Sequence, residues 1–321
     1  MKQNNNSNID PLEIDKFNKL AEDWWNPNGD FAPLHQLNPL RFEYIKTNAD
    51  LKDKVCIDIG CGGGILTESI ASKANSVIGI DLASKALSVA KSHQILSSLS
   101  NIEYQEVSIE EHARKYQNYY NVLTCMEMLE HVPFPEKTIE ACSSVVKKGG
   151  QLFFSTINRN PKSFLMAILG AEYILKLLPK GTHEYDCFIK TSELENWARK
   201  NNAVVASDEC YLGFAKDAKS ILALASGDNT NLLAVHSLSK RSNLAGYRAA
   251  FVVGDSKLID QIRQIRKHAG LMMPLPVQHA MIAALSDEKH VQEQAERYNN
   301  RRTLLSAALV AVGFRIEHSK A

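Results

Sequence analysis

From residue 55 onward, short apolar runs alternate with helical patterns, and this alternation restricts the chain to few folds. Five runs are typical of strands, at residues 55–60, 76–81, 102–107, 121–128 and 151–157. Apolar residues at helical spacing lie between them, at 65–74, 83–98 and 135–147. Such alternation indicates β-α-β units, in which helices cover both faces of a parallel sheet. We therefore expect an α/β fold with a mostly parallel sheet, whose ligands bind at the carboxyl ends of the strands.

Two further helices are expected ahead of the first strand. Asp10-Pro11 is a start signal for one of them, and Asn38-Pro39 opens the other, over residues 38–49. Trp24 and Trp25 end the first helical pattern. These two side chains either cover a site or serve as core or surface anchors.

Composition excludes several classes of protein. The 37 basic and 36 acidic residues give a formal net charge of +1, so no nucleic-acid partner is expected. The six cysteines form no CxxC pair and no Cys/His zinc spacing, which favours reduced thiols in the cytosol. The polar N-terminus does not predict a signal peptide, and no run of 18 apolar residues predicts a spanning helix.

A glycine-rich loop, DIGCGGG over residues 58–64, follows the first strand and opens a helix. Glycines let the backbone turn tightly and approach a ligand closely. Asp81, at the end of the second strand, can accept hydrogen bonds from both hydroxyls of a ribose. Asp58 would repel a phosphate but can face a cationic sulfonium. The loop thus favours S-adenosylmethionine, with a nicotinamide or flavin nucleotide and a non-binding turn as the alternatives.

Three candidate metal ligands, Glu127, Glu130 and His131, follow the fourth strand. Two carboxylates and an imidazole suit Mg²⁺, Mn²⁺ or Zn²⁺. Such an ion would lower the pKa of a catechol hydroxyl from about 10 toward neutrality. In the alternative there is no metal and His131 acts as a general base. The residue types alone leave both interpretations open.

Residues 13 to about 197 closely resemble the ubiquinone-biosynthesis O-methyltransferases. The matching segments include FNKLAEDWWNPNGDFAPLHQLNPLRFEYI, DIGCGGGILTESIA, QEVSIEEHA, TCMEMLEHVP, FFSTINRN and LMAILGAEYILKLLPKGTHEYDCFIK. The resemblance implies a class I, Rossmann-like methyltransferase fold and transfer of a methyl group from S-adenosylmethionine to phenolic hydroxyls of polyprenylated ubiquinone precursors. The family normally continues with two more strands that complete the sheet, and these are not found here.

The resemblance also implies roles for individual residues around the cofactor. Arg41 matches the position that reaches the cofactor carboxylate, Gly60 the glycine beneath the cofactor, Asp81 the ribose acid, and Met126 a residue that borders the cofactor. Glu127, Glu130 and His131 match the family's divalent-metal positions, which favours Mg²⁺ or a similar ion.

Residues 163–178 match the family's membrane-contacting insertion. They are apolar around most of a helix but too short to span a bilayer. They form either a buried helix or lid, or an interfacial element that dips into the membrane. The resemblance implies a cytoplasmic enzyme at the surface of the inner membrane, near its prenylated substrate, with other ubiquinone-biosynthesis enzymes as candidate partners.

After about Trp197 the resemblance changes. Residues 198–321 look like part of a fold-type I pyridoxal-phosphate aminotransferase, closest to the succinyldiaminopimelate type. In this resemblance Asp208 and Tyr211 contact the pyridine nitrogen and the ring hydroxyl, Lys240 is the Schiff-base lysine, and Arg248 contacts the phosphate. Asp208 would keep the pyridinium protonated, so that the ring works as an electron sink.

Other parts of an aminotransferase are not found, namely the glycine/serine phosphate loop, the N-terminal arm and the C-terminal domain with its carboxylate-binding arginine. We therefore expect two domains, a methyltransferase over residues 1–197 and an incomplete α/β aminotransferase segment over 198–321. We do not expect the second to use pyridoxal phosphate. A fragment that transaminates with a complementing chain and an inactive chimera are the alternatives.

Overall fold

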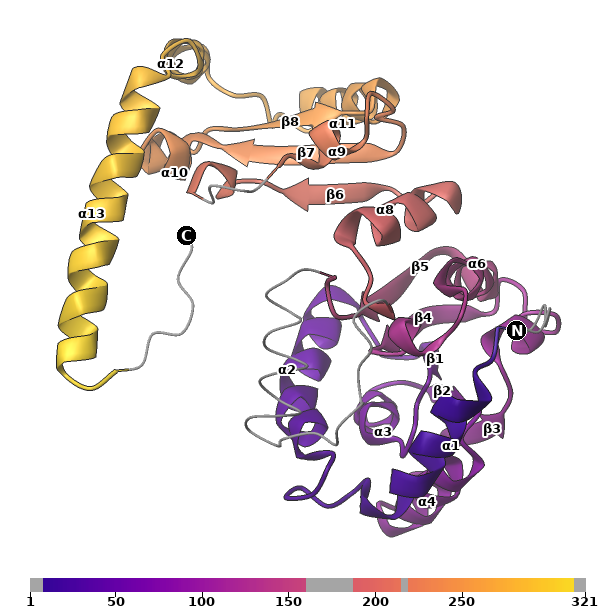
Figure 1. The fold of residues 1–321 in the computed structure, drawn as a ribbon. Helices are drawn as coiled ribbons and strands as arrows, with labels where there is room; N and C mark the ends of the chain where they lie inside the picture. The colour runs from indigo at the N-terminus through magenta and orange to yellow at the C-terminus, as the bar shows by residue number, and fades with distance from the viewer. Residues whose placement is uncertain (1–7, 160–186, 215–218, 315–321) are drawn as a thin grey trace, which may run out of the picture. The chain divides into compact units, whose positions relative to one another are not determined.

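The computed structural model describes residues 8–159, 187–214 and 219–314 (Figure 1). The chain divides into two compact units, Met1–Trp197 and Ala198–Ala321. Each unit has its own sheet. In the described ranges, no helix combines the length and apolar character needed to cross a membrane. The expected membrane-contacting segment 163–178 lies outside the described residues.

The first unit is built on a five-stranded sheet with the order β3-β2-β1-β4-β5. All neighbouring strands are parallel, which confirms the predicted α/β fold. In the centre, Ile57 of β1 pairs with Ile78 of β2 and with Leu123 of β4. The strands are β1 (Val55–Ile59), β2 (Ser76–Asp81), β3 (Ile102–Glu106), β4 (Tyr120–Met126) and β5 (Val146–Ser155).

Helices surround this sheet and bury apolar residues against it. The helical elements are α1 (Pro11–Leu20), η1 (Ala21–Asp23), α2 (Ala32–Asn48), α3 (Ile65–Ala71), α4 (Ser84–Leu96), α5 (Ile109–His112), η2 (Leu129–His131), α6 (Pro135–Val145) and α8 (Thr191–Lys200). One core cluster includes Ile45 of α2 and Ile70 of α3, and another includes Leu123 and Ile139 of α6. The central strands are buried between these clusters, which explains their near-continuous apolar sequence.

The start of the chain follows its capping signals in one place and departs from them in another. Asp10 caps α1, because its carboxylate accepts a hydrogen bond from the N–H of Leu12 at 2.9 Å, and Pro11 takes the first helical position. The second helix was expected to open at Asn38, but α2 already begins at Ala32. Pro39 therefore lies inside the helix, where packing against α3 outweighs the local start signal.

The last strand of this sheet also begins earlier than its sequence suggests. The sequence predicts a strand only from residue 151, after the Lys148-Gly149-Gly150 segment. In the structure it lies within β5, and the register with β4 shifts between Tyr120 and Val122. Gly149 has a φ of +81°, which a glycine adopts without strain. The segment is thus an irregularity in a strand rather than a connection.

The second unit contains a three-stranded sheet with the order β6-β7-β8. Its strands are β6 (Val205–Asp208), β7 (Leu232–Ser237) and β8 (Ala250–Gly254), with the first pair parallel and the second antiparallel. Short helical elements, η5 (Leu212–Phe214), α9 (Ile221–Leu224), α10 (Leu238–Arg241) and η6 (Ala245–Tyr247), connect them. β7 ends at Ser237, whose hydroxyl caps α10.

Three helices follow β8. They are α11 (Ser256–His268), α12 (Leu275–Leu285) and α13 (Lys289–Ala311). No residue in any of them is buried. Apolar side chains such as Ile282 and Leu304 are largely exposed. The apolar core of this unit is therefore small, and lies at β7 and α10, where Leu232, Ala234 and Leu238 are fully buried.

Candidate active site

A cavity of about 550 Å³ lies at the carboxyl ends of the strands of the first unit. Its walls come from α1, α2 and the segments that follow β1, β2, β3 and β4. This is the edge of a parallel sheet at which ligands are expected to bind. Four residues to which the sequence assigned cofactor contacts, Arg41, Gly60, Asp81 and Met126, all line this cavity.

The glycine loop folds over the end of β2. The backbone N–H groups of Gly60 and Cys61 both donate to the carbonyl oxygen of Ile80, at 2.9 and 3.1 Å. Gly60 has a φ of +67°, and a Cβ there would lie 2.6 Å from Cγ of Met128. A side chain at this position would be strained and would clash. Gly60 therefore permits a turn that other residues would not.

Asp81 ties the end of β2 to this loop. Its Oδ2 accepts a hydrogen bond from the N–H of Gly62 at 2.8 Å, and its Oδ1 accepts one from Ala83 at 2.7 Å. Burial raises the pKa of Asp81, although these backbone hydrogen bonds oppose the shift. A carboxylate oxygen accepts more than one hydrogen bond, so the group retains capacity for a ligand's hydroxyls.

Asp58, at the end of β1, is the second acid beside the loop. It is buried and accepts hydrogen bonds from Thr67 and Thr124, each at 2.6 Å. Burial raises its pKa to about 6, and the two threonine hydroxyls oppose that shift. Asp58 also lines the cavity. Two partly desolvated carboxyl groups thus face the same space, an environment that favours a cationic ligand.

Arg41 and Met126 also line the cavity. Arg41, on α2, forms an ion pair with Glu127. Met126 ends β4, and its Sδ accepts a hydrogen bond from Ser155 at 3.2 Å. Helix α2 therefore brings a guanidinium group to the end of the sheet, where it could bind a carboxylate of a ligand.

Each of the three predicted metal ligands has a protein partner in the described structure. Glu127 pairs with Arg41 and accepts a hydrogen bond from Ser155, while Glu130 accepts one from Thr156 at 3.0 Å. Across the described ranges, no group of three or more His, Cys, Asp or Glu side chains is placed to hold a metal ion. The assignment of Glu127, Glu130 and His131 as metal ligands therefore stays a prediction. Glu127 has a φ of +47°, and the short helix η2 follows it. The backbone therefore turns between Glu127 and His131, and the two side chains have different partners.

His131 instead pairs with a residue that the sequence did not suggest. Its Nδ1 lies 2.7 Å from Oε2 of Glu13, on α1. Burial raises the pKa of Glu13, but the hydrogen bond and charge of His131, together with Lys16, lower it below its ordinary value. Phe17 meets the imidazole edge-on, with 5.1 Å between the ring centroids. The pair spans 118 residues of sequence, so no local pattern could reveal it.

The positions assigned to a pyridoxal-phosphate site lie in the second unit. Asp208, Lys240 and Arg248 are all exposed. Lys240 Nζ lies 5.8 Å from the ring centroid of Tyr211, which is 57% exposed. The Asp208 carboxylate accepts a hydrogen bond from the N–H of Cys210, which lowers its pKa. The structure therefore brings Lys240 and Tyr211 together but leaves both in contact with solvent.

Comparison with known proteins assigns the two parts of the chain to different families. A family model described as a methyltransferase domain matches residues 34–207, and one described as aminotransferase class I and II matches residues 189–321. A ubiquinone biosynthesis O-methyltransferase from Nitrosomonas europaea is 56% identical over 197 residues, which are 61% of this chain and 83% of the relative. A protein of the same name from Nitrosospira multiformis is 54% identical over 198 residues, 62% of this chain and 82% of the relative.

Solved structures give a more distant likeness. Magnesium protoporphyrin IX methyltransferase from Synechocystis, with bound S-adenosylhomocysteine, is 17% identical and has a TM-score of 0.46 over 59% of this chain and 87% of that one. The sequence relatives and the methyltransferase model are the findings that assign the family. Residues 189–321 are similar to the aminotransferase class I and II model. The chain belongs to the ubiquinone biosynthesis O-methyltransferases and is an S-adenosylmethionine-dependent methyltransferase.

Proposed function

We propose that this enzyme methylates a phenolic hydroxyl of a polyprenylated ubiquinone precursor. The observation that carries the proposal is the apolar character of much of the cavity lining. There, α1 and α2 contribute apolar side chains, including Phe17, Leu20, Leu34 and Leu37. Such a wall suits an aromatic ring that carries a hydrocarbon tail. The names of the relatives support the same substrate class.

In this proposal the cofactor lies on the side of the cavity that holds the glycine loop. Arg41 binds its carboxylate, Asp81 accepts hydrogen bonds from its ribose hydroxyls, and Gly60 and Met126 border it. Asp58 adds negative charge that favours a sulfonium. S-adenosylmethionine supplies an activated methyl group. The residues act by aligning that methyl carbon with the phenolic oxygen for in-line displacement.

His131 is the proposed catalytic base. Its Nδ1 is held by Glu13, so Nε2 is the nitrogen left to accept the phenolic proton. Proton transfer would make the oxygen an anionic nucleophile as it attacks. The proposal assigns the proton transfer to His131 because Glu13 orients its ring, and a divalent ion held by Glu127, Glu130 and His131 is the alternative.

Membrane contact is a further part of the proposal. A polyprenylated substrate partitions into the bilayer, so the enzyme must reach it at the membrane surface. The apolar sequence 163–178 supports contact at the cytoplasmic face of the inner membrane. Other ubiquinone-biosynthesis enzymes would then be its neighbours. Sedimentation of the protein with vesicles of anionic lipid tests this contact separately from activity.

We infer that the second unit is a partial aminotransferase domain without transaminase activity. This inference is supported by the exposure of the residues assigned to the cofactor, because a catalytic cofactor site excludes water. These residues are Asp208, Tyr211, Lys240 and Arg248. The small core of the unit also supports it. The unit would then be an appendage to the methyltransferase.

The test of the proposed function compares the parent with His131→Asn, using S-adenosylmethionine and a prenylated catechol. The parent should form the methyl ether. The variant should lose about 100-fold in kcat, the order of a general-base contribution, while its affinity for S-adenosylhomocysteine stays near that of the parent. A parent that binds S-adenosylhomocysteine but methylates no prenylated phenol would refute the substrate. A fully active variant would refute the role of His131.

A further inference from the structure

Two adjacent tryptophans hold the glycine loop. Trp24 lies over the loop itself, since a Cβ at Gly62 would lie 2.0 Å from its Cζ2 and one at Gly63 would lie 2.3 Å from its Cγ. The loop can pass under this ring only because it has no side chains there. Trp24 is 7% exposed and stacks on Phe31, with 4.1 Å between ring centroids.

The side chain of Trp25 binds the backbone of the same loop. Its Nε1 donates a hydrogen bond to the carbonyl oxygen of Gly63 at 2.8 Å. Unlike Trp24, Trp25 is not one of the residues that line the cavity. Any effect of Trp25 on a ligand must therefore pass through the position of the loop.

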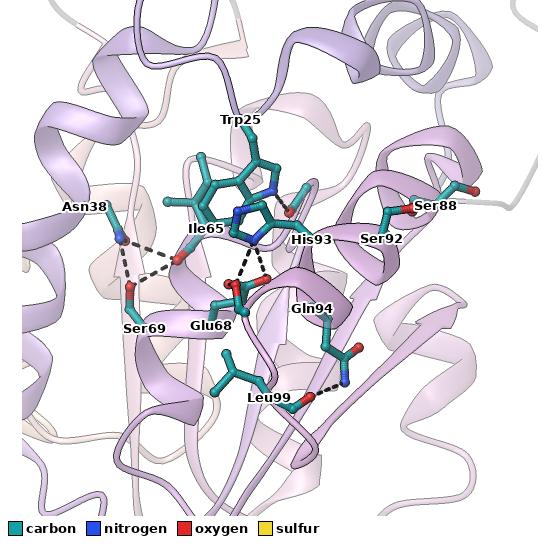
Figure 2. Close-up of polar contacts among 12 residues, drawn as sticks. Trp25, Asn38, Ile65, Glu68, Ser69, Ser88, Ser92, His93, Gln94 and Leu99 are labelled. Atoms are coloured by element: carbon teal, nitrogen blue, oxygen red, sulfur yellow. Dashed lines mark hydrogen bonds and ion pairs between the residues drawn. The ribbon is translucent and has the colours of Figure 1, made fainter.

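The indole of Trp25 is fixed in turn by His93 of α4. The two rings stack in parallel, with 3.3 Å between their centroids and 3° between their planes. Figure 2 shows this pair above Glu68 of α3, whose Oε1 lies 2.8 Å from Nδ1 of His93. The other oxygen of Glu68 accepts a hydrogen bond from Ser97 at 2.8 Å. Glu68 is buried, so this chain of contacts has little freedom to shift.

Helix α2 joins the same arrangement from the other side. Nε2 of His35 lies 2.9 Å from the carbonyl oxygen of Trp24, and the His35 ring meets Trp25 at 5.7 Å between centroids. Asn38 donates to Ser69 of α3 at 2.9 Å (Figure 2). The helix that carries Arg41 is thereby linked to the helix that the glycine loop opens.

We propose that Trp25 and His93 are positioning residues that hold residues 62–64 in the shape that receives S-adenosylmethionine. They set the affinity for the cofactor and not the rate of methyl transfer. His93 orients Trp25, Trp25 fixes the Gly63 carbonyl, and Glu68 couples both to the helix after the loop. The inference rests on the cavity as the cofactor site and is independent of the identity of the acceptor.

The decisive variant is Trp25→Phe, which keeps an aromatic ring against His93 but removes the donor to Gly63. The dissociation constant for S-adenosylhomocysteine, measured by calorimetry, should rise about 5-fold, as expected for one lost hydrogen bond. The KM for S-adenosylmethionine should rise by a similar factor, with kcat at saturation changed by less than about 2-fold. Backbone hydrogen exchange should accelerate in the peptide that contains residues 60–68.

A second variant tests the stacked pair. His93→Gln keeps a polar group for Glu68 but loses the ring, and should also weaken binding of S-adenosylhomocysteine. The double variant should bind more tightly than the product of the two single effects predicts, because both act on the same carbonyl. Trp197→Phe is the matched control, since Trp197 packs against a different core cluster. It should leave the dissociation constant unchanged.

Two results would overturn the proposal. In the first, Trp25→Phe binds S-adenosylhomocysteine as the parent does and its loop peptide exchanges at the parent rate. In the second, Trp197→Phe weakens binding as much as Trp25→Phe does, so that affinity only follows general stability. Neither measurement needs a phenolic acceptor, so failure of the proposed methylation would leave the test intact.

Discussion

Asp81 Oδ2 accepts a hydrogen bond from the backbone N–H of Gly62 at 2.8 Å, so the acid at the end of β2 is joined to the glycine loop that follows β1. The same carboxyl group lines the cavity. One side chain can therefore serve two purposes, shaping the loop and binding the ribose of the cofactor. Changes at Asp81 should affect cofactor binding through both.

Replacement of Asp81 by Ala should remove most of the affinity for S-adenosylhomocysteine. Loss of the loop contact and of the ribose contact together should raise the dissociation constant by at least about 100-fold, since hydrogen bonds to charged groups each contribute about 1.5–3 kcal/mol. Asp81→Asn keeps an acceptor oxygen and should lose less. Calorimetric titration measures both. If Asp81→Ala bound like the parent, the ribose assignment would be wrong.

Replacement of Arg41 by Gln should weaken binding of the cofactor, because Arg41 is proposed to bind the cofactor's carboxylate. The variant loses a charged hydrogen-bonding group and leaves Glu127, a half-buried acid, without its cation. The KM for S-adenosylmethionine should rise about 10-fold or more. Lys46→Gln is the control, because Lys46 is an exposed residue on the same helix. An equal effect of both substitutions on KM would argue against a direct role for Arg41.

The sequence was sufficient for the parts of the fold that depend on local patterns. The strands β1 and β2 and the loop at Gly60 follow from short apolar runs and from backbone angles that only glycine adopts readily. Gly60, Asp81 and Met126 line one cavity because the ends of parallel strands meet at one edge, and helix α2 brings Arg41 to the same cavity. These features need no knowledge of distant contacts.

The remaining features depend on packing between segments far apart in sequence. Helix α1 was predicted, but not that its Glu13 would pair with His131, because helix rotation is set by the surface beneath it. For the same reason, the sequence did not predict that Trp25 would stack on His93. The ion pair of Glu127 with Arg41 was hidden for a related reason: residue types show what Glu127 could bind, but not which side chain lies beside it.

The second unit should not retain pyridoxal phosphate. Incubation with pyridoxal phosphate followed by dialysis should leave no visible absorbance from bound cofactor, because Lys240 and its neighbours are exposed to water. Lys240→Ala is the matched control and should give the same spectrum as the parent. A visible band in the parent that is absent from Lys240→Ala would contradict this expectation and would assign a working lysine to α10.

The buried Asp58 should make stability depend on pH in an unusual direction. Burial raises its folded-state pKa from 3.8 to about 6. Between these two pH values the carboxyl group is mostly protonated in the folded protein and mostly ionised in the unfolded chain. Its contribution to the free energy of unfolding should therefore fall as the pH rises from about 4 to about 6. A shift of this size corresponds to at most about 3 kcal/mol.

Asp58→Asn removes this titration while keeping a side chain of similar size between Thr67 and Thr124. Denaturant unfolding of the parent and the variant at several pH values between about 4 and 7 isolates the effect, because the other ionisable groups are common to both. The free energy of unfolding of the variant, minus that of the parent, should increase with pH across this window and level off above the folded-state pKa. A difference that stays constant with pH would show that the pKa of Asp58 is the same in the folded and unfolded chain, so that the hydrogen bonds from Thr67 and Thr124 offset the effect of burial.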